Sequence, residues 1–510
     1  MRLESSGSAA RSNATRWWPL LAALVAGLIV PFAFAPYDWW PLAAVAPAVL
    51  LRLLHGRNAR QAARLGWLFG LGMFGHGVWW IQVSVHQFGL PFYAFSITAT
   101  AVLVAFLALY PALFAALTRL LPAPNEGCRA LLLAPALWLA CEWLRGWVFT
   151  GFPWLSLGYS QLDGPLAGIA PWLGESGCSC AVLLAAGLLA QMVVAPWRQR
   201  GALFLGLVTL LGGAQLLRGV ATTHELEGGL RVALIQGAIP QQLKWELAQR
   251  GHAFTLYSEL SAPLWRSDLV VWPETAIPAF ADEVPEMISS LDQTARAART
   301  SLLVGMPTGQ PWSGGRYYNS VVALGLKPGR YDKRHLVPFG EFFPLKSLLE
   351  NLSKLLSIPM SDFSEGDIEQ PALLAAGHVV GVSICYEDVF AREVMRALPQ
   401  AGYLVNVSND AWFGDTIAPH QHLQIARMRA LESGRYLLRA TNSGITAVID
   451  QGGRVVARAP QFQATALTSE FAARGGSTPY VRCGDYPLQG VLALTVLTVT
   501  LRGRRGKAPN

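Results

Sequence analysis

Three stretches of the sequence place chemically useful side chains at the ends of apolar runs. Glu274 lies in "WPET" after the run "DLVVW", Lys333 lies in "YDKRHLVPFGEFFP", and Cys385 ends the run "VVGVSI". A thiol is a weak nucleophile until a base removes its proton, and a carboxylate can act as that base. An ammonium group can stabilise the oxyanion of a tetrahedral intermediate. The three residue types together suit acyl transfer through a thioester.

Each of these residues also has a structural interpretation. Glu274 follows Pro273 and could cap the start of a helix. Lys333 could belong to a solvated turn, and a free cysteine such as Cys385 is often a buried core residue. The residues alone leave both interpretations open.

The segments around these residues predict an α/β domain. From about residue 229, short β-rich runs such as "LRVALIQGAIP" and "GYLVNVSND" alternate with helical stretches at 285–299, 391–398 and 419–435. Such alternation is typical of layered α/β domains with buried strands. Catalytic residues of these domains gather at strand ends and adjacent loops.

The chain as a whole has the composition of a membrane protein. Hydrophobic residues make up 52% of the 510 residues and charged residues only 14%, below the roughly 25% of soluble domains. Most of the long apolar runs reach the roughly 20 residues that span a bilayer. They lie at approximately 17–35, 39–54, 65–84, 92–118, 130–148, 165–194, 202–217 and 486–501.

The arginines predict the orientation of these runs. They precede the first run, follow the eighth, and lie in alternate connections between runs, whereas "APYDWWP" and "HQFGLPF" carry none. The positive-inside rule then places both termini in the cytoplasm and residues 218–485 outside, which is the periplasm in a bacterium. The predicted parts are a disordered N-terminus (1–16), about seven transmembrane helices (17–217), the outer domain (218–485), a last transmembrane helix (486–502) and a cytoplasmic tail (503–510).

Other patterns point away from nucleotide, metal and nucleic-acid sites. Gly70, Gly72 and Gly75 match G-x-G-x-x-G, but they lie inside a predicted membrane span, where close helix packing explains them better. The six cysteines have neither disulfide nor zinc spacing. The basic residues cluster at the ends of apolar runs and do not form one polar face, which excludes a nucleic-acid surface.

Two further pairs of ionisable residues remain without a role. Glu142 and Arg145 lie in or near a predicted membrane helix, so they are either functional or a mutually neutralised structural pair. His420 and His422 have no cysteine cluster nearby. We expect them at the surface or at a helix cap, not as metal ligands.

The three motifs resemble those of the nitrilase superfamily, whose members use a Glu-Lys-Cys triad. Apolar helices followed by such a domain and one last helix are similar to the bacterial apolipoprotein N-acyltransferase family. The segments "FPWLSLGYSQ", "QGAIPQQLKW", "VNVSNDAWFGD" and "STPYVRCGDYP" support this resemblance. It covers nearly the whole chain except the first dozen or so residues.

The resemblance implies an αββα sandwich beside a multi-pass helical membrane domain. It implies a monomeric enzyme of the bacterial inner membrane that needs no metal or other cofactor. Such an enzyme transfers an acyl chain from a phospholipid, typically phosphatidylethanolamine, to the N-terminal amine of the diacylglyceryl-cysteine of apolipoproteins. Cys385 would be the nucleophile, Glu274 the base and Lys333 the oxyanion stabiliser.

The resemblance also implies helper residues around this triad. Glu341, Tyr386 and Glu387 would support catalysis, and Trp245, Trp412 and Phe413 would lie on loops that control substrate access. Two alternative functions are compatible with the same sequence features. The chain could be a membrane-tethered amidase or hydrolase, or a non-catalytic membrane scaffold.

Overall fold

The structure, a computed structural model, describes residues 7–88, 92–244, 247–311, 314–342 and 362–505. The chain divides into two compact units. A helical unit comprises Met1–Gln82, Tyr93–Val220 and Asp485–Asn510, and a sandwich unit comprises Val83–Phe92 and Ala221–Gly484.

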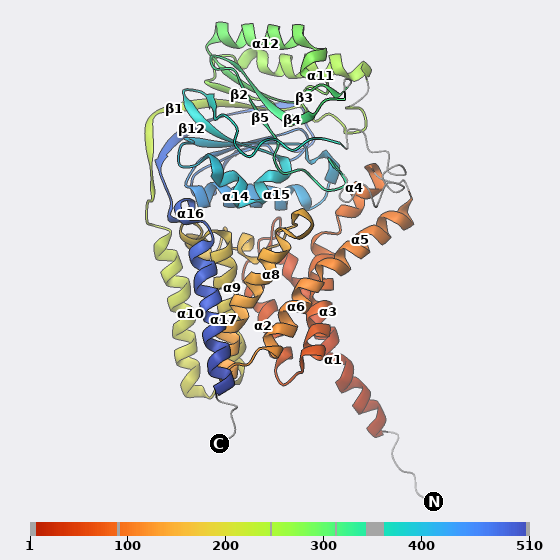
Figure 1. Ribbon diagram of the computed structural model, residues 1–510, viewed down its shortest axis with the longest axis vertical. Coiled ribbons are helices and arrows are strands. Elements are labelled where there is room, and N and C mark those ends of the chain that lie inside the picture. The colour runs from red at the N-terminus through yellow and green to blue at the C-terminus, as the bar shows by residue number, and fades with distance from the viewer. Residues whose placement is uncertain (1–6, 89–91, 245–246, 312–313, 343–361, 506–510) are drawn as a thin grey trace, which may run out of the picture. The chain divides into compact units, whose positions relative to one another are not determined.

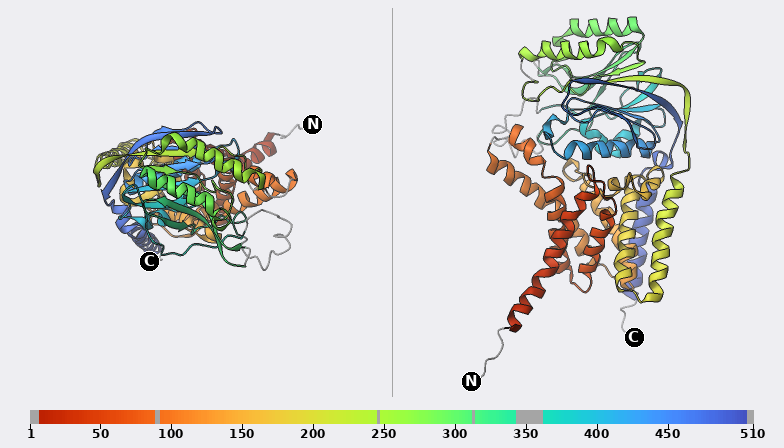
Figure 2. Two further views of the ribbon diagram at one scale, coloured as in Figure 1. Left: turned by 90° about the horizontal axis from the view of Figure 1, so that it is seen from above. Right: turned by 180° about the vertical axis from the view of Figure 1, so that it is seen from behind.

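The helical unit is built from apolar helices joined by short connections. The first helix begins at Gly7, ahead of the start predicted at residue 17. Helices α9 and α10 run side by side (Figure 2). The helices are α1 (Gly7–Ile29), α2 (Leu42–Leu54), α3 (Ala59–Gly77), α5 (Tyr93–Leu107), α6 (Leu109–Leu120), α7 (Glu126–Cys128), α8 (Ala134–Arg145), α9 (Ala170–Val194), α10 (Trp197–Leu217) and α17 (Tyr486–Arg505).

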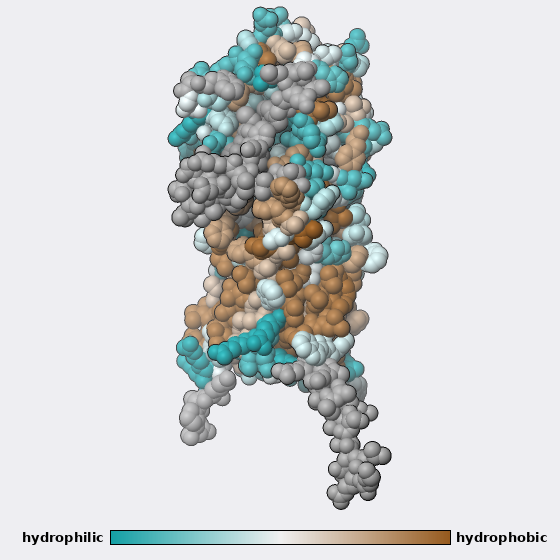
Figure 3. Space-filling view, turned by 90° about the vertical axis from the view of Figure 1, so that its right-hand side faces the viewer, coloured by the Kyte–Doolittle hydropathy of each residue, from teal (hydrophilic) through white to brown (hydrophobic). Residues whose placement is uncertain are grey.

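Four helical segments in the described part of the chain are long and apolar enough to cross a membrane. Two shorter apolar helices cover Trp17–Ala33 and Leu42–Leu54. Figure 3 shows a broad hydrophobic surface over the helical unit on the face in view. The four segments are Tyr93–Leu120, Glu126–Arg145, Pro165–Val194 and Trp197–Leu217. The larger number of crossings expected from the sequence stays a prediction.

The glycines of "GLGMFG" let helices approach closely. A side-chain carbon added at Gly70 would lie 2.7 Å from the Ala108 Cα at the start of α6, and one at Gly72 would collide with the Leu24 carbonyl of α1. Gly66 faces the Pro111 carbonyl of α6 in the same way. The predicted close packing is therefore confirmed, with α3 held against both α1 and α6.

The sandwich unit contains two six-stranded sheets. The first has the order β12-β1-β2-β3-β4-β5 and the second the order β11-β10-β9-β8-β7-β6. Strands β1, β2 and β3 are parallel neighbours, as are β7, β8 and β9. The strands are β1 (Thr223–Gln236), β2 (Leu269–Val271), β3 (Ser301–Gly309), β4 (Tyr317–Gly325), β5 (Gly329–Asp332), β6 (Leu373–Ala375), β7 (His378–Ile384), β8 (Tyr403–Ser408), β9 (Leu437–Thr441), β10 (Ala447–Ile449), β11 (Val455–Arg458) and β12 (Thr465–Gly476).

Alternating side chains of the strands build three apolar layers. In β1, Val232 and Leu234 face the second sheet, whereas Ala233 and Ile235 face α11 (Leu247–Ser261) and α12 (Pro285–Ala298). The outer face of the second sheet packs against α14 (Ala391–Val394) and α15 (Ala418–Ser433). Figure 1 shows these helix pairs on opposite faces of the stacked sheets. The unit is therefore the αββα sandwich that the family resemblance implied.

Candidate active site

Strand ends from both sheets bring the three predicted catalytic residues together. Glu274 follows β2, Lys333 follows β5, and Cys385 follows β7. All three are buried, with 7%, 1% and 9% of their surface exposed. Lys333 Nζ lies 3.8 Å from Glu274 Oε1, and both side chains interact electrostatically with the Cys385 thiol.

Cys385 has a strained backbone that marks a sharp turn. Its φ is 51°, in the left-handed region that residues with a side chain rarely adopt. The chain passes at this point from the extended strand β7 into a 3-10 helix, Cys385–Val389. Strain of this kind persists where the surroundings over-determine a conformation, and it clusters at active sites.

Lys333 is held by two carboxylates that one amide bridges. Its Nζ lies 2.9 Å from Oε1 and 2.8 Å from Oε2 of Glu341. Asn319, on β4, donates from Nδ2 to Glu274 Oε1 at 2.8 Å and to Glu341 Oε1 at 2.9 Å. The amide fixes the spacing of two like charges, and the ammonium between them offsets their repulsion.

A second buried ammonium group lies at the same site. Lys244 has 1% of its surface exposed, and its Nζ donates to the Glu274 carbonyl oxygen at 3.0 Å. It interacts electrostatically with both the Glu274 carboxylate and the Cys385 thiol. With Lys333, Glu274 and Glu341, it completes a set of two positive and two negative charges.

The environment sets the protonation states of Cys385 and its neighbours. Burial raises the pKa of the Cys385 thiol, and Glu274 raises it further against the opposing effect of Lys333. Burial alone would lower the pKa of Lys333, but Glu341 and then Glu274 raise it above its ordinary value. The thiol therefore rests protonated at neutral pH, while Lys333 stays an ammonium ion.

Of the predicted helper residues, Glu341 and Glu387 have clear contacts. Glu341 forms the ion pair with Lys333 that is described above. Glu387 is fully buried and accepts hydrogen bonds from the backbone N–H groups of Ile384 (2.7 Å) and Arg334 (2.6 Å). It therefore ties the turn that carries Cys385 to the loop that carries Lys333. Tyr386 packs edge-on against Phe390, with ring centroids 5.2 Å apart.

Two of the three predicted access residues, Trp412 and Phe413, lie together in one turn of the sandwich unit. Trp412 accepts a hydrogen bond at its carbonyl from Ser84 Oγ at 2.6 Å, and its ring lies edge-on to Phe88 at 4.4 Å. Phe413 is partly buried in the same 3-10 turn, Asp410–Phe413. Trp245 lies outside the described residues.

His422 corrects one expectation from the sequence. It is 1% exposed, and its ring nitrogens lie 2.9 Å from Asp388 Oδ1 and 2.9 Å from Asp410 Oδ1. Arg439 pairs with the same two carboxylates at 3.1 Å and 3.0 Å. The surface position predicted for His422 is wrong, because α15 is buried among charged partners from other segments; His420 is only half-buried.

Glu142 and Arg145 are both buried, and both form hydrogen bonds with a neighbouring loop. Glu142 Oε1 accepts from Trp138 Nε1 at 2.9 Å and from the Leu157 N–H at 3.0 Å. Arg145 donates to the carbonyls of Phe152 (2.7 Å) and Trp154. These contacts fold residues 152–157 onto the end of α8, which favours a structural role.

Sequence reasoning missed Asn319, Lys244 and Ser408, whose hydroxyl is hydrogen-bonded to the Cys385 thiol. Of the three, Asn319 could best have been found from the sequence. Its amide lies at the start of the apolar strand "NSVVALG", and a buried amide needs hydrogen-bond partners. Lys244 and Ser408 gave no comparable signal.

The fold and site define a carbon–nitrogen hydrolase domain, and comparison with known families agrees. The Carbon-nitrogen hydrolase model matches residues 231–480, and the Apolipoprotein N-acyltransferase N-terminal domain matches residues 26–188.

Relatives of similar length identify the family. The chain is 45% identical to the apolipoprotein N-acyltransferase of Methylococcus capsulatus over 95% of this chain and 96% of that one. It is 41% identical to the enzyme of Vibrio vulnificus, over 96% of this chain and 98% of that one. It is 42% identical to the enzyme of Pseudomonas paraeruginosa, over 96% of each chain. The chain belongs to the apolipoprotein N-acyltransferase family, and it is a membrane enzyme of the acyltransferase class.

Proposed function

We propose that this enzyme moves an acyl chain from a phospholipid to the N-terminal amine of a diacylglyceryl-cysteine on an apolipoprotein. The carrier of the acyl chain is a thioester on Cys385. The observation that carries the proposal is the buried cluster of Glu274, Lys333 and Glu341 facing this thiol, in a chain of this family. Phosphatidylethanolamine is the donor we expect.

The charge states assign one role to each residue. The thiol rests protonated, so Glu274 takes its proton as Sγ attacks the ester carbonyl of the phospholipid. Lys333 remains charged, so it stabilises the oxyanion and does not act as a base. Collapse of the tetrahedral intermediate breaks the ester C–O bond, and Glu274 returns the proton to the departing lysophospholipid oxygen.

The second half-reaction reverses these steps with an amine. The neutral α-amine attacks the thioester carbonyl, and Glu274 removes a proton from the nitrogen. The C–S bond then breaks, and Glu274 returns this proton to the departing Cys385 sulfur. An α-amino group has a pKa of about 7.7–8.0, so part of the acceptor is neutral at mild pH. The free thiol and an N-acylated acceptor result.

The proposed location is the bacterial inner membrane, with the sandwich unit on the periplasmic side. Within the helical unit, α1 begins and α17 ends at the same end (Figure 1). The arginine-rich connections near Arg52 and Arg119 meet there as well, since both residues line one cavity. These positions support cytoplasmic termini under the positive-inside rule.

The test is the intact mass of the purified full-length enzyme after incubation with phosphatidylethanolamine and no acceptor. We expect wild type to gain the mass of one acyl chain and Cys385→Ala to gain nothing. A diacylglyceryl-cysteine peptide should then discharge the acyl chain.

Two other outcomes would contradict the proposal. Discharge by water as fast as by the peptide would favour the membrane-tethered hydrolase. An acyl gain on neither protein, with the fold intact by circular dichroism, would remove Cys385 as carrier and favour the scaffold.

A further inference from the structure

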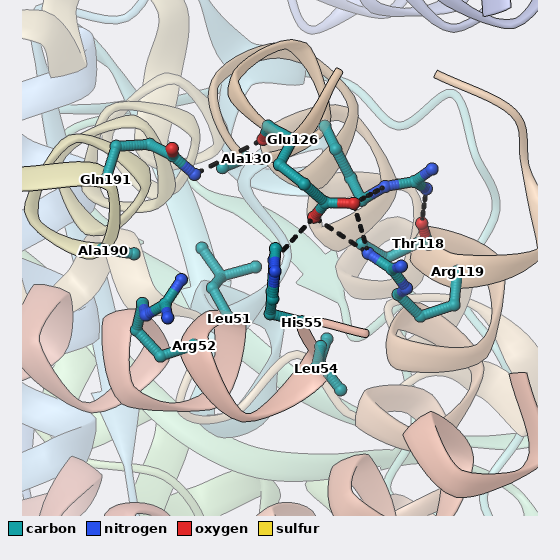
Figure 4. Close-up of a pocket in the computed structure, with 11 residues that line it drawn as sticks. Leu51, Arg52, Leu54, His55, Thr118, Arg119, Glu126, Ala130, Ala190 and Gln191 are labelled. Atoms are coloured by element: carbon teal, nitrogen blue, oxygen red, sulfur yellow. Dashed lines mark hydrogen bonds and ion pairs between the residues drawn. The ribbon is translucent and has the colours of Figure 1, made fainter. Parts of the chain in front are cut away.

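A small cavity in the helical unit is lined by positive charge. It lies among α2, α6, α7 and α9, has a volume of about 20 Å³, and includes Arg52, Arg119, Arg129 and Glu126 in its wall (Figure 4). Leu51 and Ala190 supply part of its apolar lining. Neither the triad nor the neighbouring loops of the sandwich unit contribute to it.

A single carboxylate, that of Glu126, contacts several basic side chains in this cavity. Arg119 Nη1 donates to both oxygens of Glu126 at 2.9 Å each. Arg129 Nε lies 3.4 Å from Glu126 Oε1, and His55 Nδ1 lies 3.5 Å from Oε2. Figure 4 shows His55 and Arg119 pointing toward the Glu126 carboxylate.

The charges lining the cavity do not balance. Three guanidinium groups and one carboxylate leave a net charge of +2 even with His55 neutral. The side chains of Arg119 and Arg129 are only 13% and 12% exposed, so water solvates them poorly. Like charges held together away from water are destabilising unless an anion compensates them.

One guanidinium group also remains available for such an anion. It is not that of Arg129, whose Nε lies 3.4 Å from Glu126 Oε1 and whose Nη1 donates to the Leu121 carbonyl at 2.9 Å. Within the part of the chain that the structure describes, the Arg52 side chain has no hydrogen-bond or ion-pair partner, and Figure 4 draws none for it. Guanidinium groups offer paired N–H donors that match the oxygens of a phosphate.

We propose that this cavity binds the phosphate group of an anionic lipid headgroup. A volume of about 20 Å³ admits one or two oxygen atoms, so the phosphate oxygens enter while the glycerol and acyl chains stay outside. The C-terminal turn of α17, with Arg502, Arg504 and Arg505, packs nearby, since Gly503 lies against Pro122 and Ala123. This end of the unit is therefore strongly basic, as expected at the headgroup level of a membrane facing anionic lipids.

The test measures lipid binding to the full-length enzyme in neutral detergent by native mass spectrometry. The probes are dioleoyl phosphatidylglycerol, dioleoyl phosphatidylcholine and inorganic phosphate, at one ionic strength. The key variant is Arg52→Gln, which removes no hydrogen bond or ion pair among the residues that the structure describes. Its matched control is Arg60→Gln, which removes the same charge from an exposed position of α3 outside the cavity.

We expect wild type and Arg60→Gln to bind phosphatidylglycerol equally and in preference to phosphatidylcholine. Arg52→Gln should bind it about tenfold more weakly, the effect of losing one charge-assisted hydrogen bond. Lipid in the active site affects both variants alike and so cannot produce this difference. The result is therefore independent of the proposed acyl transfer.

The proposal would be overturned if phosphatidylglycerol binding were weakened equally in both variants or in neither of them. Only the general attraction of a basic surface would then explain the binding. Displacement of the lipid by inorganic phosphate, with the same dependence on Arg52, would support the phosphate site but assign it to the free anion.

Discussion

At the scale of single residues, the site depends on Lys333 remaining charged. Glu341 contacts Lys333 through both oxygens and is the largest influence raising its pKa against burial. We expect Glu341→Gln to slow thioester formation about 100-fold, the usual cost of losing an electrostatic contribution to an oxyanion site. Single-turnover acylation, followed by intact mass, measures this rate.

Glu341→Asp is the control for this prediction, because it keeps the charge at a shorter reach. It should recover part of the lost rate. A rate for Glu341→Gln within twofold of wild type would show that Glu341 does not govern Lys333.

The burial of Lys244 predicts that its loss will slow acylation by an amount that depends on pH. Burial lowers the pKa of Lys244 to about 8. Below that pH its ammonium group favours the thiolate of Cys385, and above it the neutral amine has no such effect. We expect Lys244→Met to acylate about tenfold more slowly than wild type at pH 7 and at nearly the same rate at pH 9.5.

The control variant here is Lys327→Met, which removes an exposed lysine from the same unit and should match wild type at both pH values. A constant ratio between Lys244→Met and wild type across the pH range would mean that Lys244 acts only through packing.

At the scale of secondary-structure elements, a buried charged cluster joins the turn after β7 to β8, β9 and α15. Its members are Asp388, Asp410, His422 and Arg439. Two carboxylates, one guanidinium and one imidazolium make a neutral set, so none of these buried charges lacks a partner. The cluster holds the segment after Cys385 in place, and Ser408 extends it, since its hydroxyl lies 3.4 Å from Asp410 Oδ1.

This cluster makes stability depend on pH in a defined direction. Burial and Arg439 lower the pKa of His422, but Asp388 and Asp410 outweigh them and raise it to about 9. Because the folded pKa exceeds the unfolded value of about 6.5, the stabilisation is complete below pH 6.5 and is lost as the pH rises through 9. We expect His422→Gln to destabilise the protein by about 3–5 kcal/mol at pH 6 and much less at pH 10.

Thermal unfolding at the two pH values tests this prediction. His420→Gln is the matched control, on the same helix but only half-buried, and we expect it to behave as wild type. An equal loss of stability for His422→Gln at both pH values would show that His422 contributes as a neutral group.

At the scale of the whole molecule, the predicted topology places residues 218–485 in the periplasm and the C-terminal end of α17 in the cytoplasm. Lys327 is exposed in the sandwich unit and Arg504 is exposed at the end of α17. In a Cys483→Ser background, which removes an exposed native thiol, we expect an impermeant maleimide to label Lys327→Cys in intact spheroplasts. Arg504→Cys should react only after permeabilisation; the opposite pattern would invert the topology.

Much of the fold was predictable because its signals are local. Period-two apolar strands and period-3.6 helices follow from backbone geometry, so the alternation in the sandwich unit was visible in the sequence. The helix 285–299 is observed as α12, Pro285–Ala298. The order of the strands within two sheets was expected only from resemblance, because pairing depends on contacts between distant segments.

Burial of polar residues was the least predictable property. The sequence of α15, "APHQHLQIARMRALES", is rich in polar residues and suggests a solvated helix. In the structure His422, Arg429 and Glu432 are all buried on it. Asp388 and Asp410, which lie on other elements, make the burial of His422 tolerable, whereas Arg429 lies 3.3 Å from Glu432 on the same helix. No pattern of neighbouring residues in the sequence shows which distant groups will pair with His422.

The sequence by itself determined the membrane character of the chain and the α/β class of its second unit, and it singled out the three residues proposed for catalysis. Composition, periodicity and short motifs suffice for this because they are properties of neighbouring residues. Only the tertiary structure decided that Asn319 bridges Glu274 and Glu341 and that Lys244 is a second buried cation. These groups meet because two sheets stack and bring strand ends far apart in the chain to one place. The strength of their interactions then follows from exclusion of water, which is a property of the folded molecule alone.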